Sequence, residues 1–466
     1  MGHQLAHPPA VIPAKAGTQY AQCRGPFTDG AATSRILGPG FRRGDDQCGA
    51  NSMTRNLAVD ADRIGADIDG LAEITEPDRP WTRRAFTPTF LKGREWLTAR
   101  FEAAGLRTHI DAAGNLIGSR AGSGRKSGTL MLGSHSDTVP DGGRFDGIAG
   151  VSAALEVARA LHDQGIVLDH DLEIVDFLAE EVSIFGVSCI GSRGMIGLRP
   201  DDWLDREAHD LTLRDGIAEV GGRPSVAMHR DDIRAFLELH IEQGPVLEDA
   251  KLDIGVVTAI AGITRIEVII EGRADHAGTT PIDSRADALI AASHLVLDIE
   301  DQAVKLGGEG PIHFLATVGE FALEPNAANV VPSRVRMLVD VRAERRTHLQ
   351  HFQARLGEVT KHIAYDTNTR ITHRVVSENR ATPLDDLVIR TLDASCEAVG
   401  AGHRRMASGA GHDAAWMARV TRSGMVFIPC LGGRSHAPEE FAKTEDIALG
   451  AAVLLDAVQR LDKELD

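Results

Sequence analysis

Short apolar runs alternate with amphipathic stretches along the chain from about residue 57 onward. The run 129–135 (TLMLGSH) predicts a strand, residues 150–165 (GVSAALEVARALHDQG) predict a helix, and 172–180 (LEIVDFLAE) is again strand-like. The alternating run 236–242 (FLELHIE) predicts another strand. Strands and helices in this order are typical of an α/β domain with a largely parallel sheet. Such sheets bind ligands in the crevice at the carboxyl ends of their strands.

The same mixed pattern continues on both sides of this region. Helical patterns cover 57–74 and 91–105. From about residue 377 the pattern returns, with a predicted strand over 424–430 (GMVFIPC) and an amphipathic helix from Thr444. We therefore assign these segments to the same α/β domain.

The order of predicted strands and helices is different in the region between the two parts of this domain. Its order is strand, helix, strand, strand, helix, strand, which is a split βαβ unit compact enough to form a separate domain. The ranges are, in order, 263–271, 285–305, 312–320, 335–341, 347–362 and 371–376.

The pattern thus predicts an α/β domain with an inserted α+β (β-α-β-β-α-β) domain. Residues 53–260 and 377–466 form the two parts of the larger domain, and residues 261–376 form the insertion. Hinges are expected near Ala259–Gly262 and Val376–Arg380. A length of 466 residues exceeds what one hydrophobic core usually serves, which agrees with two domains.

The first 52 residues are rich in Gly, Pro, Arg and Gln and lack a sustained apolar period. They contain no charged start followed by an apolar core of about 7–15 residues, so they do not indicate a secretory signal. The phrases VIPAKAGTQ and GPGFRRGDD resemble a dispersed bacterial repeat element translated in frame. We expect residues 1–52 to be a disordered tail and Met53 to be the true start, with a regulatory arm as the alternative.

Charge and cysteine content restrict the function classes. A formal net charge of -17, without Lys/Arg runs among aromatics, disfavours nucleic-acid binding. No apolar run approaches the roughly 20 residues of a membrane helix. Cysteine number and spacing argue against a disulfide framework and a thiolate metal site, so a cytoplasmic protein with buried, unpaired cysteines is the simplest interpretation. The cysteines are Cys23, Cys48, Cys189, Cys396 and Cys430.

Candidate metal ligands follow four of the predicted strands. The segment 133–147 (GSHSDTVPDGGRFDG) places one histidine and three aspartates among four glycines, which allow sharp turns. Glu180–Glu181, His240 and His436 come after the other apolar runs. Because the carboxyl ends of parallel strands meet at one edge, we expect these side chains to converge there. Imidazoles and carboxylates without thiolate are typical of sites for Zn, Mn, Co or Ni.

The motifs that carry this chemistry resemble those of a known family. The stretches are GSHSDTVPDGGRFDG, AEE, ELHIEQGPVLE, GRADHAGTTP, NAANVVP, DVR, SGAGHDA and GRSHAPEE. They are similar to those of the N-carbamoyl-L-amino-acid hydrolases, allantoate amidohydrolases and ureidoglycolate amidohydrolases, the hydantoinase-carbamoylase branch of the dinuclear zinc aminoacylase and exopeptidase group. The likeness covers nearly everything from Met53 onward. It implies a zinc-exopeptidase-like catalytic domain and an inserted domain that serves as a lid and in dimerisation.

The resemblance implies a site for two divalent metal ions per subunit, Zn or else Mn, Co or Ni. Asp146 would bridge the ions, with His135 and His240 completing one site and Glu181 and His436 the other. This allocation leaves each ion three protein ligands and an open position.

The resemblance also implies catalytic roles for two carboxylates. Glu180 would take a proton from the attacking water and pass it to the leaving nitrogen. Asp137 would accept the second imidazole N–H of His135 and so fix its tautomer. Adjacent acids face opposite ways in a regular strand, which also predicts different roles for Glu180 and Glu181. The stretch EEVSIFG departs from relatives that have a glycine after the pair, which we expect to alter the pocket wall and not the chemistry.

Substrate binding is implied for five further residues. The guanidinium of Arg342 suits a bidentate grip on an α-carboxylate, with a salt bridge inside the small domain as the alternative. Gln243 and Asn329 offer amide groups that match a ureido group. His276 would act in catalysis by donating to the developing oxyanion, and in the family this histidine can complete the partner subunit's site, which implies a homodimer. His412 would contact substrate or line the pocket.

These expectations describe a metal-dependent amidohydrolase that cleaves a linear non-peptide C–N bond. The expected reaction converts an N-carbamoyl-L-amino acid to the L-amino acid, CO2 and ammonia. Allantoate and ureidoglycolate are alternative substrates because they also combine a carboxylate with a ureido group. An aminoacylase or peptidase fits less well, because HIEQGP and NAANVVP follow the ureido-hydrolysing branch. A metal-binding sensor without catalysis is the alternative from another class, and Glu180 beside all five ligands argues against it.

Overall fold

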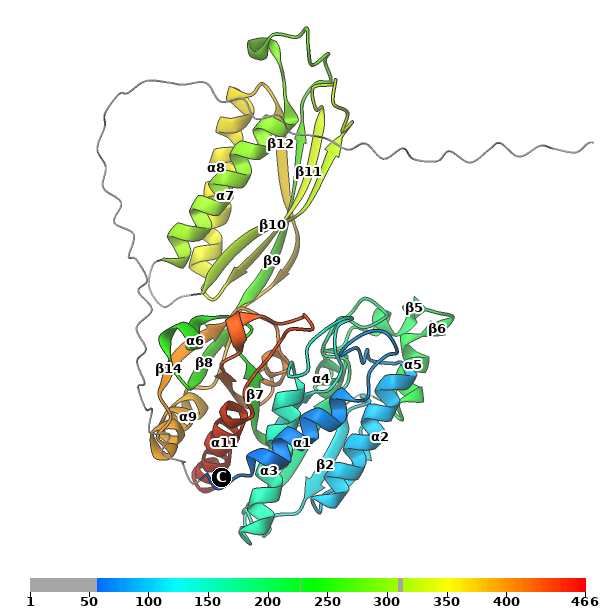
Figure 1. Ribbon diagram of the computed structural model, residues 1–466, viewed down its shortest axis with the longest axis vertical. Helices are drawn as coiled ribbons and strands as arrows, with labels where there is room; N and C mark the ends of the chain where they lie inside the picture. Colours follow the sequence, from blue (N-terminus) through cyan, green and yellow to red (C-terminus); the bar gives the residue numbers. More distant parts are fainter. Residues whose placement is uncertain (1–56, 227, 309–312) are drawn as a thin grey trace, which may run out of the picture. The chain divides into compact units, whose positions relative to one another are not determined.

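The computed structural model describes residues 57–226, 228–308 and 313–466. Within these ranges the chain forms a nine-stranded sheet and a four-stranded sheet, each with its own apolar core, and a two-stranded hairpin (Figure 1). The predictions for the tail 1–52, with its two cysteines, lie outside the described residues.

The nine-stranded sheet has the order β1-β2-β4-β3-β7-β15-β8-β13, with β14 paired to β8. Its central strands β4, β3, β7 and β15 run parallel to one another, and antiparallel pairs occur toward the edges. The predicted α/β fold with a mostly parallel central sheet is therefore confirmed. The strands are β1 (Arg107–Ile110), β2 (Leu116–Arg120), β3 (Thr129–His135), β4 (Asp171–Phe177), β7 (Ile233–Ile241), β8 (Ile254–Ile260), β13 (Thr382–Pro383), β14 (His403–Ser408) and β15 (Arg422–Ile428).

Helices α3, α9 and α11 pack directly on this sheet, and α1 packs on α3 and α11. Helix α3 is buried along almost its whole length, which explains why its sequence is apolar on every side. The helices of this part are α1 (Ala61–Ala72), α2 (Pro88–Ala103), α3 (Ile148–Asp163), α4 (Ile190–Met195), α5 (Leu213–Glu219), α6 (Val246–Ala250), α9 (Asp386–Val399), α10 (Ala414–Met417) and α11 (Thr444–Glu464). The hairpin consists of β5 (Glu207–Ala208) and β6 (Leu211–Thr212).

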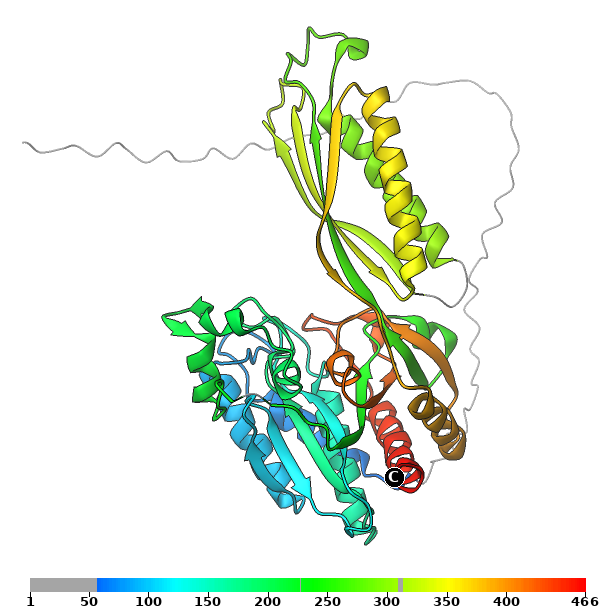
Figure 2. The same cartoon turned by 180° about the vertical axis from the view of Figure 1, so that it is seen from behind.

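The four-stranded sheet is antiparallel, with the order β10-β11-β9-β12. Helices α7 and α8 lie side by side on one of its faces (Figures 1 and 2). The chain order is the predicted β-α-β-β-α-β. The elements are β9 (Gly262–Glu271), α7 (Ala288–Gly307), β10 (Phe314–Glu324), β11 (Arg334–Ala343), α8 (Arg346–Asp366) and β12 (Arg370–Asn379).

The two sheets are joined where β8 passes into β9 and where β12 passes into β13. Only Ala261 separates β8 from β9, and its N–H donates to the carbonyl oxygen of Ser408 at 2.8 Å. The first crossing lies in the region expected near Ala259–Gly262, and the second, at residues 380–381, meets the end of the region expected near Val376–Arg380 because β12 continues to Asn379. The division into two domains with a mobile lid stays a prediction.

Two further expectations concern the described part of the chain. Cys189, Cys396 and Cys430 are free and buried. None of the helices among the described residues is long and apolar enough to cross a membrane.

Helix α3 comes very close to the central sheet at Gly150. A Cβ atom there would lie 2.2 Å from the carbonyl oxygen of Leu239 and 2.6 Å from Ser134 Cβ. We predict that Gly150→Ala lowers the free energy of unfolding by about 1–3 kcal/mol, because an added methyl group overpacks this contact. Gly65→Ala on α1 is the matched control, because its nearest atom, on Thr444, is 3.4 Å away. The control should be neutral or stabilise by up to about 1 kcal/mol. Urea unfolding followed by circular dichroism compares them, and equal stabilities would contradict the close approach.

Candidate active site

The five predicted metal ligands lie together at the carboxyl edge of the central strands. His135 is the last residue of β3, and His240 is next to last in β7. Glu181 follows β4, His436 follows β15, and Asp146 lies two residues before the start of α3. Because β4, β3, β7 and β15 are neighbours in the sheet, side chains from distant parts of the sequence converge at one crevice.

Asp146 joins the five residues into two groups. Its Oδ1 lies 3.1 Å from His240 Nε2 and 3.5 Å from His135 Nε2, whereas its Oδ2 lies 3.3 Å from His436 Nε2. Glu181 Oε1 lies 3.0 Å from the same nitrogen of His436. The ligand atoms of each group lie within 4.8 Å of one another. We call His135, Asp146 and His240 the first cluster, and Asp146, Glu181 and His436 the second cluster.

Backbone carbonyls orient the two strand-borne histidines. His135 Nδ1 lies 3.0 Å from the carbonyl oxygen of Asp137, and His240 Nδ1 lies 2.9 Å from that of Ile241. A carbonyl oxygen only accepts, so both Nδ1 atoms carry a proton, and Nε2, which faces Asp146, is the nitrogen available to a cation. This donor set of imidazole nitrogens and carboxylate oxygens fits a divalent metal.

The charges of the site favour a cation at these positions. Hydrogen bonds that His436 donates to the carboxylates of Asp146 and Glu181 raise the pKa of His436 to about 11. Burial disfavours the charged form of Asp146, but the charge of His240 and the hydrogen bonds of three imidazoles hold the pKa of Asp146 well below its usual value. Burial likewise opposes the charge of His135, yet the neighbouring carboxylates raise its pKa well above the usual value. The carboxylates of both clusters are therefore stabilised by positive charge beside them, which a bound cation would also supply.

Gly147 allows His135 and Asp146 to approach each other. Its φ is 68°, in the left-handed region that favours glycine. A Cβ at this position would lie 2.5 Å from the imidazole carbon Cε1 of His135. The glycine next to Asp146 is thus required both by the turn and by the space that the His135 ring occupies.

Asp137 links the His135 loop to the two glutamates. Its carboxylate oxygens accept the N–H of Glu180 at 3.1 Å and of Glu181 at 3.2 Å. Its Oδ1 lies 3.5 Å from His135 Nδ1, farther than its own carbonyl oxygen. In this geometry the backbone carbonyl of Asp137 orients the His135 imidazole. The Asp137 carboxylate holds the segment of Glu180 and Glu181, which follows β4.

Glu180 and Glu181 do not lie in a strand. Strand β4 ends three residues before Glu180, and Ala179 has a φ of 53°, which is incompatible with an extended chain. The prediction that Glu180 and Glu181 face opposite sides of a strand was therefore wrong, because β4 ends before these two residues. Their different surroundings come from the turn: Glu181 contacts His436, whereas Glu180 Oε2 lies 3.8 Å from His135 Nε2.

Glu180 occupies a buried position beside the first cluster. Burial raises the pKa of the Glu180 carboxyl well above its usual value; the charge of His135 opposes this shift and that of Glu181 adds to it. Its Oε1 lies 3.4 Å from Cys189 Sγ. A carboxyl whose protonated form is favoured by burial is suited to take up a proton and to give it back.

Two of the predicted substrate residues lie against the clusters. Gln243 Nε2 donates to Asp146 Oδ2 at 2.7 Å, and its Oε1 is buried without a hydrogen-bond partner among the described residues. His412 is buried, its ring lies 4.5 Å from the His240 ring, and its Nε2 is 2.9 Å from Ser408 Oγ. His412 thus lines the site by packing on a member of the first cluster.

The other three predicted substrate residues lie at opposite ends of the four-stranded sheet. Arg342, near the end of β11, donates through Nη1 to the carbonyl oxygen of Gly409 at 2.9 Å. His276 follows the other end of β9, and the residue after it donates to the carbonyl oxygen of Asn329 at 3.0 Å. The ten residues of β9 span about 30 Å. Across the described ranges, no hydrogen bond or ion pair links His276 or Asn329 to either cluster.

Sequence reasoning did not single out three polar residues at the site. Ser435 and Glu440 lie within the quoted motif GRSHAPEE, and the only signal is their nearness to His436. Both bond to the Asp146 segment in the structure. Cys189 was expected only as a small buried residue; it is buried, and it also contacts Glu180.

Comparisons with known proteins agree with this geometry. The family model of Peptidase family M20/M25/M40 matches residues 131–460. The chain is 35% identical over 409 residues to an N-carbamoyl-L-amino-acid amidohydrolase of Paenarthrobacter aurescens, covering 86% of this chain and 98% of that protein. It is 35% identical over 429 residues to a ureidoglycolate hydrolase of Arabidopsis thaliana, with 88% of each chain covered. It is 32% identical over 399 residues to an allantoate amidohydrolase of Bacillus subtilis, covering 84% and 96%.

A solved structure extends the similarity to the fold. An amidase of the hydantoinase/carbamoylase family from Burkholderia multivorans matches with a TM-score of 0.81 and 35% identity, covering 86% of this chain and 98% of the other. The resemblance that the motifs indicated is therefore confirmed. The chain belongs to Peptidase family M20/M25/M40, a family of metal-dependent hydrolases.

Proposed function

We propose that this chain is an amidohydrolase that cleaves a linear non-peptide C–N bond. Its proposed substrate is an N-carbamoyl-L-amino acid, and the products are the L-amino acid, CO2 and ammonia. The observation that carries the proposal is the pair of clusters that share Asp146, with the carboxyl of Glu180 beside them. The names of the similar proteins support the class of bond.

The residues of the site can perform the required proton transfers. Divalent ions held by the two clusters would supply Lewis acidity, which polarises a carbonyl group and lowers the pKa of an attacking water. Glu180, at the edge of the first cluster, is placed to accept the proton of that water. Because burial favours its protonated form, it is also suited to deliver the proton to the leaving nitrogen.

Arg342 is the proposed anchor for the substrate carboxylate. Its Nε donates to Asp340 Oδ1 at 3.0 Å, and its Nη1 donates to the carbonyl oxygen of Gly409 at 2.9 Å. These bonds fix the plane of a guanidinium group, whose fork matches a carboxylate. The contact with Asp340 is also the structural salt bridge that the sequence left open as an alternative, so the two roles need a direct test.

Allantoate and ureidoglycolate are the alternative substrates. Both carry a carboxylate and a ureido group, and the similar proteins include hydrolases named for each at 32% and 35% identity. The N-carbamoyl-L-amino-acid amidohydrolase is 35% identical to this chain. Sequence identity therefore does not distinguish between the three substrates. An aminoacylase or peptidase reaction is a more distant alternative, and a sensor without catalysis would leave the buried carboxyl of Glu180 without a use.

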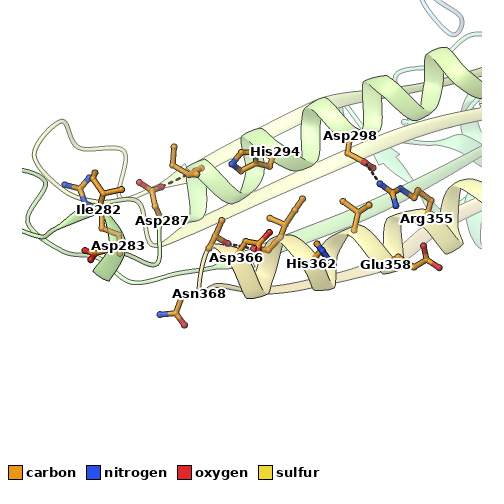
Figure 3. Close-up of a pocket in the computed structure, with 15 residues that line it drawn as sticks. Ile282, Asp283, Asp287, His294, Asp298, Arg355, Glu358, His362, Asp366 and Asn368 are labelled. Carbon is orange, nitrogen blue, oxygen red and sulfur yellow. Dashed lines mark hydrogen bonds and ion pairs between the residues drawn. The ribbon is translucent and has the colours of Figure 1, made fainter.

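The exposed side of α7 supports a homodimer. Ile290, Leu297 and Val304 follow one another at seven-residue spacing and are 50%, 62% and 70% exposed. Seven residues make about two helical turns, so these side chains form one apolar stripe. A groove of about 1010 Å³ separates α7 from α8 and is crossed by the ion pair of Asp298 and Arg355 (Figure 3). We infer that a second copy of the chain covers this surface.

A second copy would also account for the separate positions of the substrate residues. His276 and Asn329 lie at the end of the four-stranded sheet away from Arg342. We propose that they complete the site of the partner subunit, where His276 donates to the developing oxyanion and Asn329 binds the ureido group with Gln243.

The substrate proposal predicts ammonia release from N-carbamoyl-L-amino acids and not from allantoate or ureidoglycolate. The measurement uses the full chain, stripped of metal and reloaded with Zn or Mn, with all three substrates in parallel. Activity on allantoate or ureidoglycolate alone would replace the substrate and keep the class of bond. If two ions bind and no substrate releases ammonia, the proposal of a ureido substrate fails and an acyl-amide or peptide substrate takes its place. Glu180→Gln is the catalytic control: turnover should fall by about 10²- to 10⁴-fold while the metal content stays the same.

Arg342→Ala should reduce kcat/KM for carboxylate substrates by about 10- to 100-fold, mainly through KM, because a charge-assisted pair with the substrate is lost. Arg336→Ala is the matched control, since Arg336 lies on the same strand and pairs with Glu267 and Glu320 instead. An N-carbamoyl amino acid amide, which lacks the carboxylate, should show no difference between the wild-type chain and Arg342→Ala. Equal losses for both substrates would assign Arg342 to the structural salt bridge with Asp340.

Complementation between subunits tests the shared site. Glu180→Gln and His276→Ala should each be nearly inactive as homodimers. A heterodimer that carries one variant on each chain should recover about half of the wild-type activity, because one of its two sites is intact. Co-expression with two affinity tags allows the heterodimer to be isolated. An inactive heterodimer would show that His276 serves its own chain.

A further inference from the structure

Glu440 lies in the loop that carries His436 and bonds to the loop that carries Asp146, and none of the roles above uses it. Its side chain is buried. We propose that Glu440 is a positioning residue that holds the shared carboxylate of Asp146 and thereby maintains the second cluster. This inference rests on the two-ion site proposed above.

Glu440 holds the backbone on the N-terminal side of α3. Its Oε1 accepts the N–H of Phe145 and the N–H of Asp146, both at 2.9 Å. Hydrogen bonds from two consecutive amides to one carboxyl oxygen fix the direction of the peptide unit between them. The Asp146 side chain extends from the end of this peptide unit. Glu440 therefore fixes the position from which the shared carboxylate reaches the two clusters.

Glu440 also acts on the side chain of Asp146 through Ser435. The Ser435 hydroxyl lies 2.8 Å from Glu440 Oε2 and 2.8 Å from Asp146 Oδ2. A hydroxyl has one proton to donate, so it can serve only one of the two carboxylates. When it donates to Glu440, Asp146 Oδ2 accepts from Gln243 Nε2 and keeps a lone pair for a cation. That oxygen is the one that faces His436 in the second cluster.

The loop leaves space for Glu440 by having a glycine opposite it. A Cβ at Gly143 would lie 1.9 Å from Glu440 Oε1, and its three nearest atoms would all belong to Glu440. Gly143 does not have a positive φ, so its backbone is open to other residues. The space taken by the carboxylate, and not the turn, therefore requires glycine here.

The two clusters differ in how strongly the scaffold holds them. His135 and His240 stand on neighbouring central strands, and backbone carbonyls orient both rings. His436 lies in a loop beyond β15, and its side chain is half exposed. Loss of Glu440 should therefore loosen the second cluster more than the first.

The test measures metal binding and does not depend on activity. Metal-free full-length protein is titrated with Zn²⁺ against a chromophoric chelator, and circular dichroism monitors folding. The wild-type chain should bind two ions. Glu440→Ala should retain the tighter ion and bind the other about 10- to 100-fold more weakly, as is typical when a group behind a ligand is removed. Glu440→Gln should give an intermediate loss, because its amide oxygen can still accept the two N–H groups.

Glu439 offers a matched control in the same loop. Its exposed side chain pairs with Arg434 at 3.1 Å and makes no contact with Asp146 in the described structure. Glu439→Ala should bind both ions as the wild-type chain does. Gly143→Ala is a second route to the same defect, because its methyl group displaces the Glu440 carboxylate. In the Glu440→Ala background, Gly143→Ala should cause no additional loss.

The outcomes separate this inference from the proposed site. If the wild-type chain binds two ions and folded Glu440→Ala binds both with unchanged affinity, the inference is overturned and the site stands. Equal weakening of both ions would also overturn it. If the wild-type chain binds fewer than two ions, the two-ion site falls and this inference falls with it. If Glu440→Ala does not fold, the test uses Glu440→Gln and Gly143→Ala instead. Wild-type affinity for both ions in these two variants would overturn the inference.

Discussion

The burial of several carboxylates at one sheet edge is the constraint on which the structure depends. Asp146, Glu180 and Glu181 are each less than 10% exposed. A carboxylate removed from water is costly unless positive charge or hydrogen-bond donors compensate it. The imidazoles around Asp146 provide part of that compensation, and the proposed divalent ions would provide the rest. The two clusters, the Asp146 carboxylate that they share and the proposed role of Glu440 all follow from the need to compensate these buried charges.

The scaffold meets the constraint by bringing strand ends together at close range. Neighbouring parallel strands deliver His135 and His240 to the same edge, and α3 approaches the sheet at Gly150 so that Asp146 can reach them. Gly147 then allows the ring of His135 to lie against the turn. Rigid strands hold the first cluster, whereas loops hold the second, and this difference gives Glu440 its importance.

The four-stranded sheet divides the substrate contacts between its two ends. Arg342 lies at the end joined to the larger sheet, and His276 and Asn329 lie about a strand length away. One chain therefore contains all the groups of the proposed reaction without assembling them in one place. The apolar stripe on α7 supplies a surface for a second copy, so the proposed chemistry and the proposed dimer depend on each other.

The sequence by itself determined the α/β pattern and the β-α-β-β-α-β order of the second sheet, because strand and helix periodicity are local features. Its motifs, with the resemblance that they carry, also indicated five candidate metal ligands, which the structure brings to one crevice. It did not predict that β4 ends before Glu180, since the N–H groups beyond it bond to Asn115 and Asp137, which are distant in sequence. Nor did it identify Glu440, whose partners lie almost 300 residues away. Only the tertiary structure decides which atoms meet across such distances, because hydrogen bonds between loops depend on how the whole sheet is packed.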